Sequence, residues 1–175
     1  MSHYSISLNE MSEVLDEMNQ GDTEEHHASV LLLTCIDFRF FDEVEDVIRA
    51  KGLVGDYDHV IVAGAELGPV IDFGPEPKPH WRDFFLDHLK LSKSLHDISK
   101  VLVLGHEDCG AYKKFVGPID PQDEESVHLK YAEKLKALID EQGLNLEFEA
   151  HMLRSVRDVR AESREKLSNS GEKSV

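Results

Sequence analysis

Short apolar runs alternate along this chain with longer segments of helical periodicity, and this alternation restricts the folds that it can adopt. Residues 30–36 are apolar on both alternating sides apart from one threonine, which is typical of a strand buried on both faces; 58–63 and 101–104 are predicted to be similar strands. Segments 41–51 and 81–95 lie between these runs and are predicted to be helices. Strands that alternate with helices predict an α/β domain with a mostly parallel central sheet flanked by helices.

The remaining segments fit the same single domain over residues 1–175, because a chain of this length forms one compact domain more readily than two. A helix is predicted over 123–142, and a fourth strand follows at 144–148. We expect an amphipathic docking helix at about 8–20 and a polar, disordered tail at about 161–175.

The ends of two predicted strands bring cysteine and histidine side chains near each other. Right-handed crossovers allow the second strand to lie outside the first, and the fourth strand beside the third then completes the order 2-1-3-4. Cys35 closes the first strand, and His106 follows the third strand after a single residue. Because neighbouring strands lie about 5 Å apart, we expect Cys35, His106 and Cys109 to converge at the carboxyl edge of the sheet.

The charge of the chain excludes several kinds of partner. Its formal net charge is -16, and residues 1–38 contain eight acidic residues and no lysine or arginine. Such a chain repels nucleic acid and anionic membrane surfaces, so neither is expected as a partner. The first residues have neither the basic start nor the unbroken apolar block of a signal peptide or anchor, which predicts a cytoplasmic protein. In that reducing compartment, the two cysteines are expected to bind metal or to be reactive.

Two cysteines and one histidine are a ligand set suited to zinc. Thiolate sulfur binds zinc at about 2.3 Å and imidazole nitrogen at about 2.0 Å, and three protein ligands leave the fourth tetrahedral position open. The spacing of His106 and Cys109 allows both to reach one ion from a turn between a strand and a helix, where backbone amides help to hold the Cys109 thiolate. The predicted cofactor is therefore Zn²⁺ bound by Cys35, His106 and Cys109.

The motif CIDFR adds a carboxylate and a guanidinium beside this predicted site. If the backbone is extended, Asp37 and Arg39 project to the same side and can pair. A carboxylate held by arginine is less available as a zinc ligand and can accept a hydrogen bond from zinc-bound water. The alternative is an ion pair with a structural role only.

These residues resemble the β-class carbonic anhydrases, whose signature is C-x-D-x-R followed, some tens of residues later, by H-x-x-C. The chain supplies CIDFR and GHEDCGAY, and the resemblance covers residues 30–112. It implies that Cys35, His106 and Cys109 are the zinc ligands and that Asp37 and Arg39 are catalytic. The implied reaction is reversible hydration of carbon dioxide to bicarbonate by a zinc-bound hydroxide, in a homodimer or a higher homo-oligomer built from dimers.

Three other interpretations of the site remain. Departures from the family pattern at Phe38, Glu107 and residues 62–68 make carbonyl sulfide or carbon disulfide an alternative substrate for hydrolysis on the same zinc site. A second alternative is a non-catalytic, zinc-stabilised interaction domain, closed by a fourth ligand such as Asp37. In the simplest alternative, the cysteines are buried thiols and the histidine is part of the core.

Aromatic and histidine residues outside the motifs are interpreted as parts of the core. The doublets at 40–41 and 84–85 are predicted to be mostly core, with a dimer interface or an apolar pocket as the alternative. His88 lies on the apolar face of its predicted helix and is expected to be a core or interface histidine.

Overall fold

The computed structural model of the chain describes residues 27–71 and 77–154. The predicted docking helix at 8–20 and the predicted tail at 161–175 lie outside the described residues. Within those ranges, each helix is too short or too polar to cross a membrane.

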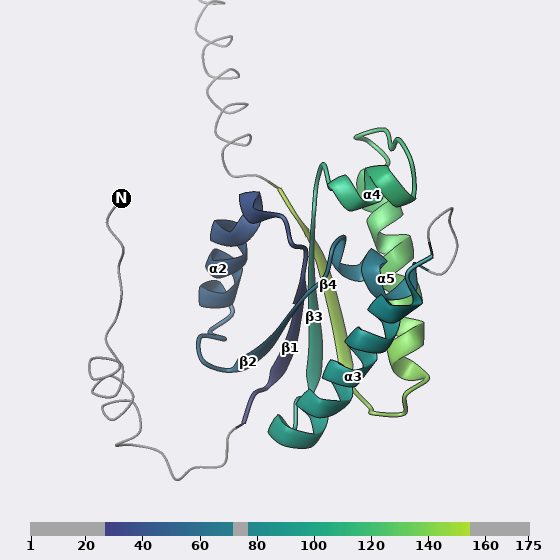
Figure 1. Cartoon of the computed structure of the whole chain (residues 1–175). Coiled ribbons are helices and arrows are strands. Elements are labelled where there is room, and N and C mark those ends of the chain that lie inside the picture. The colour runs from purple at the N-terminus through teal and green to yellow at the C-terminus, as the bar shows by residue number, and fades with distance from the viewer. Residues whose placement is uncertain (1–26, 72–76, 155–175) are drawn as a thin grey trace, which may run out of the picture.

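A four-stranded parallel sheet forms the centre of the fold (Figure 1). Its strands are β1 (Val30–Thr34), β2 (Tyr57–Ile61), β3 (Lys100–His106) and β4 (Glu147–Leu153). They pair in the order β2-β1-β3-β4, and all three pairings are parallel. The predicted fold class and strand order are therefore confirmed.

Three longer helices cover the two faces of this sheet (Figure 1). Helix α2 (Phe41–Ala50) packs on one face, whereas α3 (Pro79–His96) and α5 (Glu124–Asp140) pack on the other. Pro79 begins α3, where its missing N–H leaves no hydrogen bond unmade. The helix boundaries lie within a few residues of the predicted ones.

Three short helical segments surround the carboxyl ends of the strands. They are η1 (Phe38–Phe40), η2 (Ala65–Val70) and α4 (Gly110–Phe115). Every residue of η2 is buried, although this segment has no counterpart among the predicted elements. All three segments are therefore placed where they contribute to a site at the carboxyl edge of the sheet.

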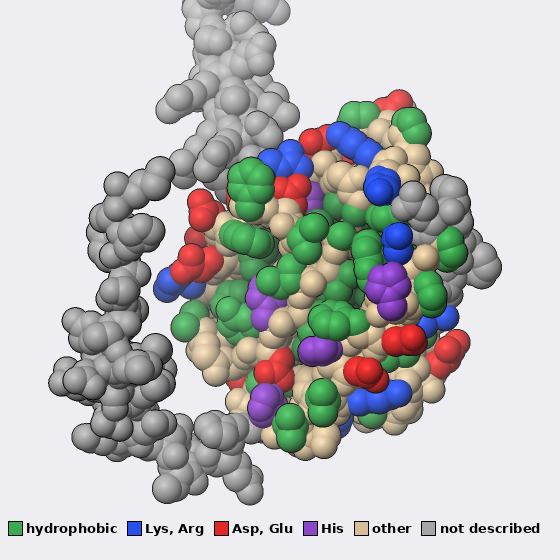
Figure 2. Space-filling model, viewed as in Figure 1, with side chains coloured by type: hydrophobic (Ala, Val, Ile, Leu, Met, Phe, Trp, Pro, Cys, Tyr) green, Lys and Arg blue, Asp and Glu red, His purple; other side chains and the backbone are tan. Residues whose placement is uncertain are grey.

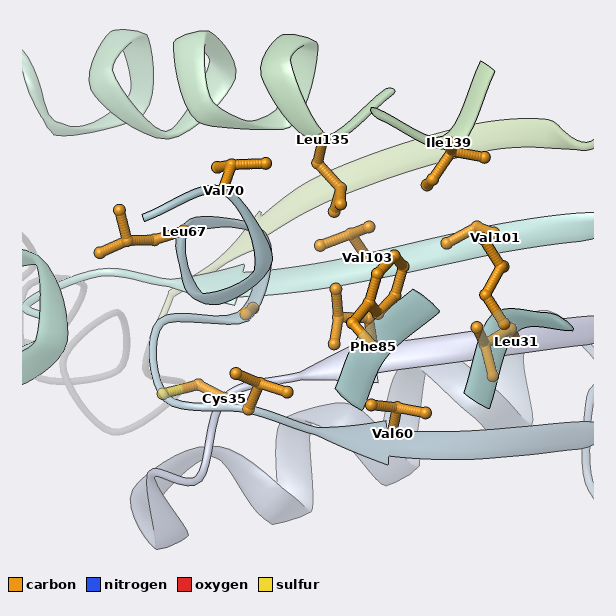
Figure 3. Packing of buried hydrophobic residues seen from close by; sticks show 14 of the residues in the cluster. Leu31, Cys35, Val60, Leu67, Val70, Phe85, Val101, Val103, Leu135 and Ile139 are labelled. Carbon is orange, nitrogen blue, oxygen red and sulfur yellow. The ribbon is translucent and has the colours of Figure 1, made fainter. Parts of the chain in front are cut away.

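Alternate strand residues face two separate cores, which explains why the strands are apolar on both sides. Leu31 packs in the core beneath α3 and α5, together with Phe85 and Leu135 (Figure 3). Its neighbour Leu32 faces the opposite way and packs with Ile48 of α2. Burial on both faces holds β1 and β3 rigidly and fixes the positions of the residues that follow them.

The fourth strand begins later than predicted. It runs from Glu147 to Leu153 instead of over 144–148. Gly143 and Asn145 both have left-handed backbone conformations, with φ of 67° and 53°, so the chain turns there before it can extend. β4 also carries polar residues on its exposed side, which conceals it from a search for apolar runs.

The aromatic doublets are only half buried. Phe40 and Phe85 are core residues, but Phe41 and Phe84 are 47% and 43% exposed. His88 is exposed as well, so it is not a core residue, and its alternative role as an interface histidine stays a prediction. Helical geometry allows one residue of each doublet to face the sheet while its neighbour points about 100° away.

Candidate metal centre

The three predicted ligands come together at the carboxyl edge of the sheet. Cys35 directly follows β1, His106 is the last residue of β3, and Cys109 caps the start of α4. Thr34 pairs with Leu104, so the two strands reach this edge at nearly the same level. One ligand atom from each residue lies within 4.8 Å of the others, and the two sulfurs are 3.9 Å apart. The predicted convergence is confirmed.

A tight turn carries the chain from His106 to Cys109. Asp108 lies in the left-handed region with φ of 56°, a conformation that aspartate tolerates better than most residues. The amide of Glu107 donates to the carbonyl of Leu153, and the amide of Asp108 donates to Glu124 at 2.6 Å. The turn is thus fixed to β4 and α5, and it points Cys109 back toward His106.

The imidazole of His106 is oriented as a metal ligand requires. Its Nδ1 lies 2.8 Å from the carbonyl oxygen of Glu107, which can only accept, so Nδ1 carries the proton and Nε2 presents a lone pair. The ring stacks on Phe40 with centroids 4.4 Å apart. Nε2 is buried and has no hydrogen-bond partner among the residues that the structure describes. A buried lone pair without a donor is costly unless a cation binds it, so the site fits a metal ion.

The two thiols share a buried, polar environment. Hydrogen bonding from Cys109 lowers the pKa of Cys35, whereas hydrogen bonding to Cys35, together with burial, raises the pKa of Cys109. The amide of Gly64 donates to the Cys35 sulfur at 3.3 Å, and the amides of Ala111 and Tyr112 favour the Cys109 thiolate. These backbone donors stabilise negative sulfur, the form in which cysteine binds metal.

Asp37 and Arg39 pair in the structure, although not on an extended backbone. Residues 38–40 form the 3-10 turn η1, and Asp37 caps it by accepting from the Arg39 amide at 3.1 Å. The Arg39 side chain donates to both carboxylate oxygens, from Nε at 2.9 Å and from Nη2 at 2.7 Å. These hydrogen bonds lower the pKa of Asp37 to about 2. Asp37 Oδ2 lies 3.8 Å from His106 Nε2, which places this carboxylate beside the Cys-His-Cys cluster.

A second carboxylate holds Arg39 from the other side. Arg39 Nη1 donates to Asp108 Oδ2 at 3.1 Å, and Nη2 donates to the Asp108 carbonyl at 3.2 Å. Lys113 also pairs with Asp108. The guanidinium is thereby fixed between residues that follow β1 and β3. Asp108 is not among the predicted site residues, although its position between His106 and Cys109 requires it to lie at this edge.

An open cavity of about 550 Å³ adjoins the cluster. Cys35, Asp37 and Arg39 contribute its polar wall, and most of the remaining wall is apolar. Phe38 lines it as well and is 80% exposed. Small, weakly polar molecules can therefore reach the cluster from solvent.

The fold and the site together define a parallel α/β domain with a Cys-His-Cys cluster at the ends of its strands. Comparison with known proteins identifies the family of this domain. Residues 25–154 match the family described as "Putative carbonic anhydrase". The chain belongs to this carbonic anhydrase family, as the resemblance in the sequence implied.

Two curated relatives are rickettsial proteins without an assigned activity. An uncharacterized protein of Rickettsia bellii is 33% identical over 119 residues, which cover 66% of this chain and 70% of that protein. Uncharacterized protein RC0076 of Rickettsia conorii is 30% identical over 119 residues, which cover 66% of this chain and 62% of that protein.

Solved structures with a similar arrangement include two carbonic anhydrases. That of Streptococcus mutans gives a TM-score of 0.46 at 18% identity, covering 85% of this chain and 89% of that chain. A β-carbonic anhydrase isoform of Trichomonas vaginalis gives 0.47 at 16% identity, covering 86% of this chain and 94% of that chain.

Proposed function

We propose that this protein is a zinc-dependent enzyme that catalyses the reversible hydration of carbon dioxide to bicarbonate. The observation that carries the proposal is the buried Cys35, His106 and Cys109 cluster beside the Asp37–Arg39 pair. Membership of a carbonic anhydrase family supports it.

Cys35, His106 and Cys109 would hold the metal ion. Two thiolates and one imidazole are donors that zinc prefers, and they offset its charge. Zinc bound there would supply Lewis acidity that lowers the pKa of a water molecule toward neutrality. Asp37 is not part of the group whose ligand atoms lie within 4.8 Å of one another, which supports a metal site with three protein ligands and a fourth position for water.

Asp37 would act as the hydrogen-bond acceptor that orients the attacking water. Its low pKa keeps it ionised throughout the working range, and Arg39 engages both of its oxygens. A carboxylate held in this way keeps its orientation and is less free to bind the metal itself. Asp108 would act as a positioning residue, because it holds the guanidinium that holds Asp37.

The substrate would occupy the adjoining cavity. Carbon dioxide is small and has no net dipole, so apolar walls can hold it without hydrogen bonds. The Arg39 guanidinium supplies positive charge near the place where bicarbonate forms. The apolar, exposed Phe38 also favours the second candidate reaction, hydrolysis of carbonyl sulfide or carbon disulfide.

Assembly as a homodimer, or as a higher homo-oligomer built from dimers, is part of the same proposal. Figure 2 shows apolar side chains, with histidines among them, gathered between α2 and α3 in the region of β2. Phe84, Leu91 and Leu95 of α3 and Ile61 of β2 are each at least 42% exposed. Burial of such a surface against a second copy would remove apolar area from water. We also propose a cytoplasmic location, because two free cysteines that are close together fit a reducing compartment.

Parallel assays of the full chain test the reaction. The protein is loaded with zinc, stripped with a chelator and reloaded, and each form is assayed for carbon dioxide hydration and for sulfide release from carbonyl sulfide. We expect hydration to follow zinc content through the cycle. Full zinc content with sulfide release but no hydration would contradict carbon dioxide hydration and support hydrolysis of carbonyl sulfide. Full zinc content with neither activity would support a non-catalytic zinc domain.

A further inference from the structure

A second buried polar cluster lies between η2, α4 and α5. It consists of Glu66, Tyr112 and His128, which are at most 4% exposed. Tyr112 donates its hydroxyl to Glu66 Oε1 at 2.9 Å, and His128 Nδ1 hydrogen-bonds to the same oxygen. Burial, followed by the charge of Glu66, raises the pKa of Tyr112, so the phenol keeps its proton. A carboxylate oxygen that accepts twice requires a proton on His128 Nδ1.

Glu66 and His128 each have a second polar side-chain atom at this cluster. Glu66 Oε2 and His128 Nε2 are buried, and neither has a hydrogen-bond partner within the described part of the chain. With the proton on Nδ1, the neutral form of His128 presents a lone pair at Nε2, as the carboxylate does at Oε2. In that form the cluster presents two buried acceptors, and the described residues supply no donor for them.

These residues line a cavity between α5 and β4. Its volume is about 260 Å³, and no residue that lines it also lines the cavity beside the metal centre. Leu129, Ala132 and Met152 give it an apolar wall, and Glu125 and His151 complete its polar part. Gly105 of β3 leaves room for the cluster, because a Cβ there would lie 2.9 Å from both Glu66 carboxylate oxygens and from His128 Nδ1.

We propose that this cavity is a binding site for a small organic ammonium ion, such as a protonated primary alkylamine. Its N–H groups donate to Glu66 Oε2 and His128 Nε2, and its short alkyl chain packs against Leu129, Ala132 and Met152. The site goes beyond the proposed hydration of carbon dioxide and does not depend on zinc.

The charge and chemistry of the cavity favour an ammonium ion over the other small ligands. Glu66 places a buried carboxylate in the lining, so an anion would be repelled there and would bring no proton for either acceptor, whereas Glu125 is exposed and pairs with Arg154. A metal ion needs several ligand atoms around one point, and among the described residues only the Cys35, His106 and Cys109 group provides three within 4.8 Å. An ammonium ion supplies positive charge and more than one donor together.

Calorimetric titration of the full chain with n-propylammonium chloride tests the proposal. The titration is made at about pH 8, where a primary alkylamine in solution is protonated. We expect saturable binding, and no binding of sodium propionate, which has a similar chain and the opposite charge. Binding of propionate as tight as that of the amine, or the absence of saturable amine binding, would overturn the proposal and leave a cavity filled only by water.

Variants locate the binding. Glu66→Gln removes the charge of one acceptor, and His128→Phe keeps a ring against Tyr112 but removes the other acceptor; each should weaken binding at least about tenfold. Because both residues are buried, a third variant uses an exposed position. Leu129 is 60% exposed, and Leu129→Lys brings positive charge to the cavity without disturbing the core.

The matched control is Val54→Lys in the turn between α2 and β2, where valine is 65% exposed. Leu129→Lys should weaken amine binding at least about tenfold, whereas Val54→Lys should leave it unchanged. Equal binding by these two variants would overturn the proposed location, even if the buried variants do not fold.

Discussion

Two buried histidines in this protein, His106 and His128, share an orientation but differ in their neighbours. Each has Nδ1 held by an oxygen and Nε2 buried without a hydrogen-bond partner in the described ranges. His106 lies with two thiols beside an open cavity, whereas His128 lies with one carboxylate and one phenol at a smaller cavity. We infer from the comparison that the neighbours decide what a buried lone pair would bind: two thiolates would complete a metal site, and a single carboxylate would leave a hydrogen-bonding site.

The largest difference between the two clusters is expected in zinc content after one sulfur is removed. Cys109→Ser removes a charged ligand, so we expect zinc affinity to fall more than about 100-fold and carbon dioxide hydration to disappear with it. His128→Asn, the matched change in the other cluster, should retain zinc. Metal analysis after dialysis checks both variants. Full zinc content in Cys109→Ser, or its loss in His128→Asn alone, would contradict the assignment of the two clusters.

Loss of the guanidinium should reduce turnover without removing the metal. Arg39→Ala frees both oxygens of Asp37, and we expect carbon dioxide hydration to fall about 10²- to 10³-fold at unchanged zinc content. The pKa of Asp37 should rise from about 2 toward its ordinary value, which still leaves it ionised at neutral pH. The loss should therefore persist across the neutral range. Wild-type turnover in the zinc-loaded variant would remove Arg39 from the mechanism.

A smaller effect is expected from the outer carboxylate. Asp108→Asn keeps the size and the left-handed preference of this residue but removes the charge that holds Arg39. Hydration should fall about tenfold with the zinc content unchanged, because the guanidinium keeps its contact with Asp37. Initial rates at saturating substrate measure this. A loss as large as that in Arg39→Ala would mean that Asp108 does more than position the guanidinium.

The smallest effect should appear in stability alone. Tyr112→Phe removes one donor from the Glu66 carboxylate, and we expect the free energy of unfolding to fall by about 1–3 kcal/mol. Zinc content and turnover should stay within about twofold of the wild type, since the Tyr112 amide near Cys109 is retained. Urea denaturation measures the first quantity. An unchanged stability would show that water replaces the phenol at Glu66 without cost.

The strand pattern predicted much of the fold and of the metal centre. Residues 30–33 and 101–104 are apolar on both sides because two cores flank β1 and β3, and right-handed crossovers permit the observed strand order. Once the ends of β1 and β3 are known to be neighbours, Cys35 and His106 have to meet. This inference needs only the positions of residues in the strands, and such positions are visible in the sequence.

Contacts made by short turns were not predictable in the same way. The pairing of Asp37 with Arg39 was predicted from an extended backbone, whereas the η1 turn makes it, and the contact of Arg39 with Asp108 depends on a left-handed conformation that was not predicted. Glu66 lies in a segment for which no helix was predicted, and its partner His128 lies 62 residues away in the sequence. Neither periodicity nor local propensity encodes such contacts, because tertiary packing alone selects them.

Gly105 lies between the metal centre and the Glu66–His128 cluster in the fold. Gly105 precedes the metal-site histidine on β3, and any Cβ there would collide with Glu66 and His128. A larger residue at this position would therefore require the side chains of Glu66 and His128 to move or to be smaller. The strand residue just before the metal-site histidine thus limits how the second cluster can be filled.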